Sequence, residues 1–210
     1  EISANQILNN YIENAHDNYE ENRNIPSIKG TSSLSPYLKH GQISPNRILS
    51  LLRKQNPQTW KNSQFIAEIG WREFACHLLF HYPKTINNPL RDEFQNFPWQ
   101  INQGAYNRWS KGLTGYPFVD AGMRQLWQTG WMHNRVRMVV ASFLVKHLLI
   151  DWRRGAQWFW DTLFDADLAS NTLGWQWVAG CGADAAPYFR IFNPTLQSKK
   201  FDPDGLYIKK

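Results

Sequence analysis

The sequence contains few cysteines and no long apolar run. Its two cysteines, Cys76 and Cys181, are too few for a disulfide framework and too widely separated for a metal-ligand pair, so we expect a reducing, cytoplasmic compartment. No apolar stretch is long enough to cross a bilayer, and no basic-then-apolar leader opens the chain. These absences favour a soluble protein without a membrane partner.

The two ends of the chain also lack features that complete proteins usually have. Glu1 is not an initiator residue, and the last four residues form neither a cap nor a polar tail. A length of 210 residues fits one domain that can bury a core and a pocket. We therefore expect residues 1–210 to form one domain, truncated at both ends, of a longer protein.

Alternating strand patterns and Asn-Gly hairpin signals are missing, and helical periodicity takes their place. Apolar residues recur at three- and four-residue spacing over 65–79, a run that Pro83 ends, and again over 136–148. Prolines after Ser44 and Tyr116 predict helix starts, while Gly41 and Gly130 predict helix ends. The pattern predicts an all-α fold. The polar region 83–115 reads as a long connection broken by short turns and packed by its own aromatic residues.

Aromatic residues and positive charge are the features in excess. Aromatic side chains make up 15% of the chain, with 11 tryptophans against 3 methionines, and packing is the ordinary explanation for them. The formal net charge is +6, which favours an anionic partner such as nucleic acid or an acidic membrane surface.

A cluster of small hydroxyl residues precedes a short helical run. It comprises Thr31, Ser32, Ser33, Leu34 and Ser35, followed by a proline. Exposed N–H groups at a helix start, with hydroxyl donors beside them, can bind a phosphate. The alternative is an ordinary helix N-cap.

One face of the predicted helix over 65–79 carries mixed chemistry. Glu68, Trp71, Arg72 and Ala75 share a stripe, because residues three and four apart lie on the same face. A carboxylate, a flat ring and a small residue together can line a pocket for a flat ligand. The alternative is a solvated Glu68–Arg72 pair beside a buried tryptophan.

Two further groups of polar and aromatic residues follow. Asn134, Arg137 and Met138 form a second stripe, and Asp165 and Asp167 precede Asn171, Trp175 and Trp177. The two aspartates lack nearby His or Cys partners for a metal site, so we predict no metal and instead a helix cap, or pairing with a buried arginine. The two tryptophans lie about 200° apart around a helix and should have different roles.

Several long motifs together make the sequence similar to the photolyase/cryptochrome family, and specifically to bacterial-type (class I) photolyases for cyclobutane pyrimidine dimers. The resemblance covers essentially the whole chain. The matching stretches are 30–35 (GTSSLS), 71–74 (WREF), 114–117 (TGYP), 130–135 (GWMHNR), 165–177 and 186–194 (APYFRIFNP).

The resemblance implies an all-helical domain that binds FAD. Tyr19 and residues Thr31 through Ser35 would hold the pyrophosphate. Arg137 would pair with Asp165 beside the isoalloxazine ring, with Asn134 close by, and Asp167 would accept a hydrogen bond from the ring or the ribityl chain. Asn171 would face flavin N5, where an amide adds no negative charge next to a reduced, anionic flavin.

The same resemblance implies damaged DNA as the substrate. Trp71 and Trp177 would stack on the flipped-out dimer, and Glu68, Asn134 and Met138 would contact its edge. Arg23, Arg72, Arg135 and Arg190 match positions that grip DNA phosphates in the family, which predicts binding that weakens with salt.

In the family, a chain of three tryptophans carries an electron from the surface to photoexcited oxidised flavin, and Trp99, Trp152 and Trp175 match it. Reduced FAD then absorbs blue light, passes an electron to the dimer, and regains it after the ring opens. The residues that the resemblance makes catalytic are Glu68, Asn171, Trp175, Trp152 and Trp99.

The sequence departs from the family pattern in one string, because Asn171-Thr172-Leu173-Gly174-Trp175 replaces the usual Asn-Asn-Gly-Gly-Trp. The family's N-terminal α/β domain, which holds an antenna pigment, is not part of these 210 residues, so an antenna is possible but not assigned. Rivals are a cryptochrome light sensor and a photolyase for the six-four photoproduct, which typically has a histidine at position 134. A helical DNA-binding protein without cofactor is a third reading. We expect a monomer.

Overall fold

The computed structural model describes residues 3–55, 57–58, 60–185 and 189–210, and every regular element in these ranges is a helix. The α-helices are α1 (Ala4–Asn14), α2 (Tyr19–Asn22), α3 (Ser35–Lys39), α4 (Pro45–Gln55), α5 (Gln64–His81), α6 (Gln103–Ser110), α7 (Pro117–Thr129), α8 (Asn134–Ser142), α9 (Trp152–Thr162), α10 (Leu168–Ala179) and α11 (Pro194–Phe201). Short 3₁₀ helices are η1 (Trp60–Asn62), η2 (Pro83–Ile86) and η3 (Asp92–Phe94), and the segment η4 (Phe143–His147) is a π-helix.

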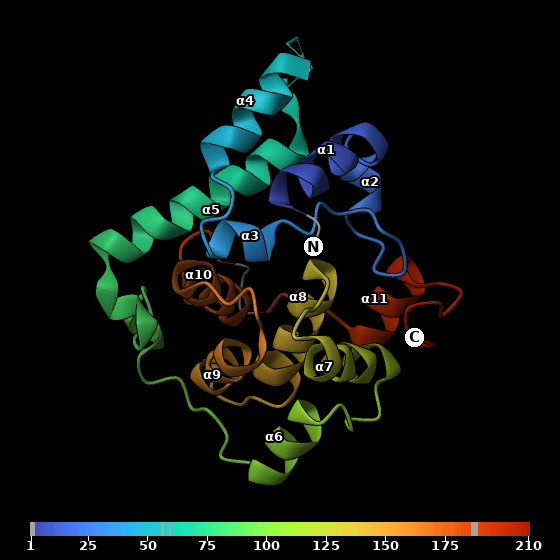
Figure 1. The fold of residues 1–210 in the computed structure, drawn as a ribbon. Coiled ribbons are helices and arrows are strands. Elements are labelled where there is room, and N and C mark those ends of the chain that lie inside the picture. Colours follow the sequence, from blue (N-terminus) through green and yellow to red (C-terminus); the bar gives the residue numbers. More distant parts are fainter. Residues whose placement is uncertain (1–2, 56, 59, 186–188) are drawn as a thin grey trace.

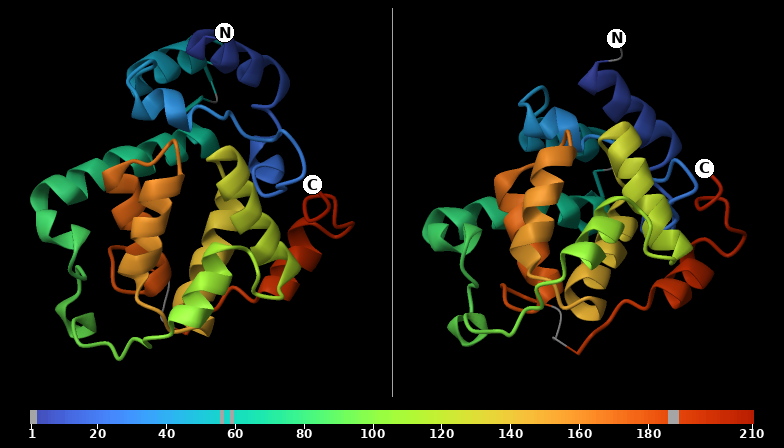
Figure 2. Two further views of the ribbon diagram at one scale, coloured as in Figure 1. Left: turned by 60° about the horizontal axis from the view of Figure 1, so that its bottom comes forward. Right: turned by 90° about the horizontal axis from the view of Figure 1, so that it is seen from below.

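The long helix α5 separates two groups of helices (Figures 1 and 2). Helices α1 to α4 pack on its N-terminal half, around a small core that includes Leu8, Ile48, Leu52 and Phe65. Helices α6 to α10 enclose the larger core, and α10 contacts α5, α8 and α9. Helix α10 therefore joins the larger group to α5.

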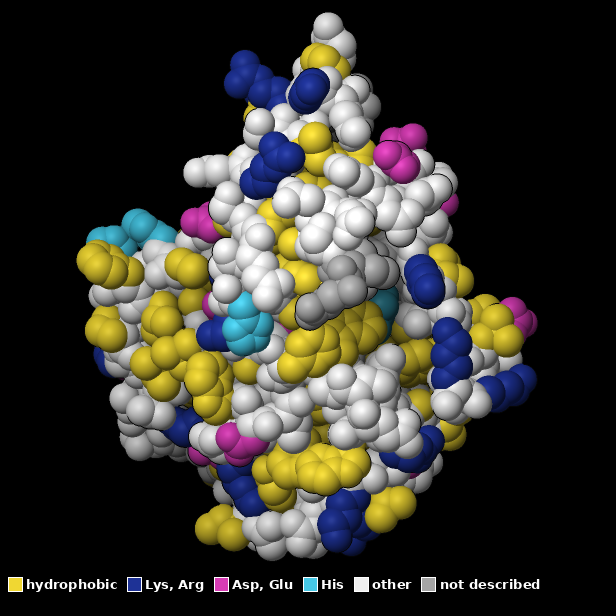
Figure 3. All heavy atoms as spheres, viewed as in Figure 1, with side chains coloured by type: hydrophobic (Ala, Val, Ile, Leu, Met, Phe, Trp, Pro, Cys, Tyr) yellow, Lys and Arg dark blue, Asp and Glu magenta, His cyan; other side chains and the backbone are white. Residues whose placement is uncertain are grey.

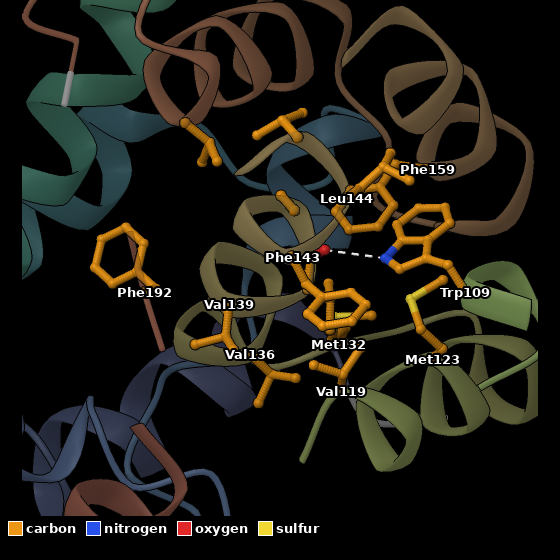
Figure 4. Close-up of a cluster of buried hydrophobic side chains, with 14 of the residues drawn as sticks. Trp109, Val119, Met123, Met132, Val136, Val139, Phe143, Leu144, Phe159 and Phe192 are labelled. Carbon is orange, nitrogen blue, oxygen red and sulfur yellow. Dashed lines mark hydrogen bonds between the residues drawn. The ribbon is translucent and has the colours of Figure 1, made fainter. Parts of the chain in front are cut away.

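The larger core is packed closely around a fully buried tryptophan (Figure 4). The indole N–H of Trp109 donates to the carbonyl oxygen of Val140 at 2.9 Å, which satisfies the one polar group that its burial would otherwise leave unpaired. Helices α9 and α10 approach closely because Gly155 has no side chain: a Cβ there would lie 2.1 Å from the Trp175 ring. The contact between Gly155 and the Trp175 ring thus holds α10 close against α9.

Most helix boundaries agree with the sequence signals. Helix α5 begins after the N-cap Ser63 and ends two residues before Pro83. Helices α4 and α7 begin at Pro45 and Pro117. Gly130 caps α7 in the left-handed conformation (φ 67°), and Gly41 (φ 69°) follows the end of α3. The predicted all-α class and these helix ends are confirmed.

Two features of the fold differ from the prediction. The region 83–115 is not only a connection, because it contains α6, whose start is capped by the side chain of Asn102 and which buries Trp109. The helix expected over 136–148 changes from α to π at Phe143. Apolar spacing does not distinguish a π turn from an α turn over five residues, and the polar exposed face of α6 concealed its apolar one.

Candidate functional site

A cavity of about 560 Å³ lies between α5, α8, α10 and the loop before α10, within the size range of ligand-binding pockets. Side chains from residues far apart in the sequence meet there. Those predicted from the sequence that line the cavity are Arg23, Glu68, Trp71, Arg72, Asn134, Arg137, Met138, Asp165, Asp167, Asn171, Trp175 and Trp177.

The stripe on α5 faces the cavity, and its charged residues pair across the site. Glu68 accepts from Arg23 at 2.6 Å and from its neighbour Gln64 at 2.9 Å, while Arg72 lies 3.4 Å from Asp167. The local Glu68–Arg72 pair considered in the alternative reading is therefore not the arrangement observed. Trp71 is 45% exposed, so it is a wall of the cavity and not a core residue.

An ion pair between the half-buried Arg137 and the buried Asp165 forms the floor of the site. The guanidinium of Arg137 donates to Asp165 Oδ2 at 2.9 Å and to the carbonyl oxygen of Met132 at 2.7 Å. The hydroxyl of Ser35 donates to the same Oδ2 atom at 2.6 Å. Asp165 Oδ1 is buried and has no partner among the described residues. A buried carboxylate oxygen without a donor is suited to accept a hydrogen bond from a ligand.

Asp167 and Asn171 belong to the start of α10. Asp167 caps the helix by accepting from the backbone N–H of Ser170 at 2.9 Å. Burial raises its pKa, but the hydrogen bonds from Ser170 and the nearby Arg72 lower it further than burial raises it, so the carboxylate stays charged. Asn171 donates through Nδ2 to the carbonyl oxygen of Ala156 at 2.9 Å, which leaves its side-chain oxygen available to a ligand.

The two tryptophans near the end of α10 have different surroundings, as their spacing predicts. Trp175 is 2% exposed, packs on Phe159 and Trp109, and its buried indole N–H has no partner among the described residues. Trp177 is half-buried and stacks on Phe192. Trp71 and the Asn134–Met138 pair, whose Nδ2 and Sδ atoms are 3.9 Å apart, line the same cavity.

The hydroxyl cluster lies beside the cavity but does not cap a helix. The N-cap of α3 is Leu34, which is buried and has no capping side chain, so the N-cap alternative is wrong. Of the five residues, Ser35 is tied to the cavity by its bond to Asp165, and Ser32 accepts from the Leu34 N–H. The hydroxyls of Thr31 and Ser33 have no hydrogen-bond partner in the part of the chain that the structure describes.

Tyr19 belongs to the small core and not to the cavity lining. It packs on Tyr11 and Phe65, and the guanidinium of Arg23 lies over its ring. Burial, followed by the charge of Glu68, raises its pKa to about 12, so the phenol is a neutral donor at ordinary pH. The predicted phosphate contact of Tyr19 stays a prediction.

The two arginines predicted at the DNA surface that do not line the cavity differ in exposure. Arg190 is exposed, and its guanidinium lies over the Phe192 ring. Arg135 is half-buried, lies over Phe201 at 4.4 Å and donates to Asn24. These contacts give Arg135 a role in joining α8 to α11 and to the segment after α2. The motif 186–194 includes residues 186–188, which lie outside the described residues.

The three tryptophans of the predicted electron route occupy one continuous core. Trp175 and Trp152 are each 2% exposed on α10 and α9, and Trp99 packs against the same cluster at its edge. The backbone around Trp99 is held beside α9 because the Gln100 N–H donates to the carbonyl oxygen of Leu149 at 2.7 Å. The electron route through these three tryptophans stays a prediction.

Some cavity residues were not identified from the sequence. Gln64 lies one turn before Glu68 on the same stripe, so its spacing could have indicated it. Ala183 and Asp184 line the cavity from the segment after α10, where no periodic pattern exists to reveal them. Among the described residues, no group of three or more His, Cys, Asp or Glu side chains is placed to hold a metal ion.

Comparison with known proteins assigns the family. A family model described as the FAD binding domain of DNA photolyase matches residues 65–210, which include the helices α5, α8 and α10 that line the cavity. The chain belongs to this photolyase family. It is 53% identical over its whole length to the deoxyribodipyrimidine photo-lyase of Agrobacterium fabrum, of which it covers 44%. It is 47% identical, over 97% of the chain, to the deoxyribodipyrimidine photo-lyase of Escherichia coli, again covering 44%.

The fold agrees with a solved photolyase. The chain superimposes on the crystal structure of a bacterial class III photolyase from Agrobacterium tumefaciens with a TM-score of 0.93 and 53% identity, covering 98% of this chain and 43% of that one. The chain thus spans less than half the length of the photolyases it matches. The class I assignment stays a prediction, because a relative this similar is described as class III.

Proposed function

We propose that this chain is the FAD- and lesion-binding part of a light-driven photolyase that splits cyclobutane pyrimidine dimers in DNA. The observation that carries the proposal is the composition of the cavity between α5, α8 and α10. The hydrogen-bonding groups at its floor would bind a cofactor; they are Asp165, Asp167 and Asn171. The side chains of its walls would bind a flat, uncharged substrate; they are Glu68, Trp71, Asn134, Met138 and Trp177.

The residues present fit FAD. The free Oδ1 of Asp165 would accept from a ring N–H, since Oδ2 already holds Arg137 and Ser35. Asp167 would accept from the ring or ribityl chain, and the Asn171 amide would face the ring without adding a charge. Thr31, Ser32 and Ser33, with Tyr19, would hold the pyrophosphate. Bound in its reduced form, FAD would supply an electron donor that light can excite.

The aromatic walls would hold the dimer against the cofactor. Trp71 and Trp177 present two indoles to the cavity, and base-sized rings stack on such surfaces. Glu68 is held in place by Arg23 and Gln64 and would contact the edge of the dimer, together with Asn134 and Met138. A lesion that has left the duplex fits this arrangement, because damaged bases cost less to unstack.

Positive charge would bring the DNA to the cavity. The net charge is +6, and basic side chains gather along the edge of the molecule over α11 and the C-terminal residues (Figure 3). Arg23 and Arg72 lie at the cavity, and Arg190 is exposed near Trp177. We propose that these cations, with Arg135, contact phosphates and that the protein binds DNA as a monomer.

Trp99, Trp152 and Trp175 would return oxidised cofactor to its active form by carrying an electron inward from the edge of the core. We further propose that the protein works in the cytoplasm. In the part of the chain that the structure describes, every helix is too short or too polar to span a membrane. An antenna pigment would require sequence outside these 210 residues.

The second candidate is a cryptochrome-type light sensor, which shares the flavin fold. The residues predicted to contact the dimer are all present in the cavity lining, and this favours repair over sensing. They are Glu68, Trp71, Asn134, Met138 and Trp177. The deciding experiment incubates the full-length flavoprotein, reduced, with a dimer-containing oligonucleotide under blue light and in the dark. We expect dimers to disappear only in the light. A flavin-loaded protein that leaves dimers intact under both conditions would support the sensor instead, and a pure, folded protein without a flavin absorption band would contradict both.

A further inference from the structure

Phe192 is held in a fixed position beside α8. It precedes α11, its side chain is 7% exposed, and its backbone N–H donates to Ser142 Oγ at 3.2 Å. Ser142 is fully buried at the C-terminal end of α8. In Figure 4, Phe192 stands apart from the close group formed by Trp109, Leu144 and Phe159. Its ring therefore has another packing partner.

That partner is the wall of the cavity. The Phe192 ring stacks on Trp177 with 6.1 Å between centroids and 28° between planes. The guanidinium carbon of Arg190 lies 5.6 Å from the centroid of the same Phe192 ring. One buried ring thus contacts both a half-buried indole that lines the cavity and an exposed cation.

We infer that Phe192 is a positioning residue for lesion recognition, acting through Trp177 and Arg190. An indole on a helix surface can occupy several χ1 and χ2 rotamers, and a stacked neighbour selects one of them. Arg190, lying over the same ring, is kept close to that wall, where a phosphate flanking the lesion would lie. The inference rests on the proposed function, because it requires Trp177 to be a stacking wall.

The test uses the full-length flavoprotein with Phe192→Leu, which removes the ring, and Phe192→Tyr, which keeps it. We expect Phe192→Leu to weaken binding to a dimer-containing duplex by about 3- to 10-fold, which corresponds to the loss of one aromatic pair. Binding to undamaged duplex should change less, so discrimination falls. Phe192→Tyr should bind like the wild type. Flavin absorbance, measured for each variant, should be unchanged.

Phe143→Leu is the matched control. Phe143 is also buried in the larger core (4% exposed), but its ring contacts Tyr116 and His147 and not Trp177. It removes a ring from the core and should leave discrimination between damaged and undamaged DNA unchanged. An equal loss of discrimination in Phe143→Leu would mean that general core loosening is responsible, and this would overturn the inference.

A double-mutant cycle separates this inference from the proposed function. In a Trp177→Ala background, Phe192→Leu should weaken dimer binding by less than about twofold, because the wall is already gone and only the contribution through Arg190 is left. A full additive loss would contradict the inference. If Trp177→Ala weakens dimer binding while Phe192→Leu does not, the inference alone fails. If Trp177→Ala leaves dimer binding unchanged, the proposed role of the wall fails, and the inference fails with it.

Discussion

The charged residues at the floor of the cavity show how a buried carboxylate finds hydrogen-bond partners. The Asp165 side chain is 1% exposed, which would be costly for an isolated charge, but Arg137 and Ser35 both donate to its Oδ2 atom. This arrangement fixes the side chain and leaves Oδ1 free. At the scale of a residue, one carboxylate holds an ion pair through Oδ2 and, in the proposed function, would accept a hydrogen bond from the cofactor through Oδ1.

Asp165→Asn should therefore affect both stability and cofactor binding. Removing the charge of Asp165 leaves the half-buried Arg137 without its carboxylate partner, and we expect the free energy of unfolding of the apoprotein to fall by about 2 kcal/mol. FAD retained through gel filtration should also decrease. Asp92→Asn is the control, since Asp92 is 85% exposed in its pair with Lys84 and should change neither quantity measurably. If urea unfolding gives the same free energy of unfolding for Asp165→Asn and the wild type, the Asp165–Arg137 pair does not stabilise the fold.

Trp177→Ala tests the stacking wall directly. Loss of the indole should weaken binding to a dimer-containing duplex by about 1–3 kcal/mol while FAD stays bound, because the floor residues are untouched. The control is Trp127→Ala, which removes an indole that is 71% exposed and outside the cavity lining. Equal dimer affinities for wild type and Trp177→Ala would make this tryptophan a packing residue.

At the scale of elements, the start of α8 depends on a buried histidine. His133 Nδ1 accepts from the Arg135 N–H and so caps the helix that carries Asn134, Arg137 and Met138. Burial, with the charges of Arg135, Arg137 and Arg23, lowers the pKa of His133 to about 4. The imidazole is neutral at pH 7, and the cap that positions these residues requires the neutral form.

This cap makes stability depend on pH. Between pH 6.5 and 4 the unfolded chain takes up a proton at His133 that the folded chain does not, so the free energy of unfolding falls as the pH falls. With a pKa of about 4 for His133 in the folded protein, the free energy of unfolding falls by about 2 kcal/mol between pH 7 and pH 5. His133→Asn keeps a side-chain acceptor for the cap but has no group that titrates in this range. In urea unfolding, its free energy of unfolding should therefore fall by about 2 kcal/mol less between pH 7 and pH 5 than that of the wild type. Parallel pH dependences for wild type and variant would contradict it.

The proposed electron route involves Trp175 on α10, Trp152 on α9 and Trp99 in the loop before α6, and substitution of Trp99 should separate two activities. Trp99→Phe should slow photoreduction of oxidised flavin, because phenylalanine is far harder to oxidise than tryptophan. Repair by protein already in the reduced state should be unaffected. Absorbance of oxidised flavin under illumination measures the first and dimer loss the second. Trp127→Phe serves as control, and an equal loss of both activities in Trp99→Phe would mean that the route is wrong.

Local patterns predicted elements and faces better than they predicted partners. The stripe on α5 and the boundary residues Pro45, Pro117 and Gly130 follow from spacing and backbone preference, and the structure confirms them. Ion pairs between distant residues could not be predicted from the sequence. Glu68 pairs with Arg23, 45 residues earlier, instead of with Arg72, one turn away. Tertiary packing decides between such pairs, and a single sequence contains no measure of it.

At the scale of the whole molecule, one cavity is formed by segments from both halves of the chain. Helix α5, with Arg23, contributes one wall, while α8, α10 and the loop before α10 contribute the others. The central claim is that cofactor and lesion share this cavity, with the lesion against the face of the flavin. The chain covers less than half of the photolyases it resembles, so this claim is best tested on the full-length protein.

The most direct measurement is the fluorescence lifetime of the reduced flavin in the full-length protein, with and without DNA. Electron transfer to a dimer in contact with the flavin competes with emission, so a saturating dimer-containing duplex should shorten the lifetime. The same duplex without the dimer should leave it unchanged. Equal lifetimes with damaged and undamaged DNA, both bound at saturation, would contradict the claim that the two share one cavity.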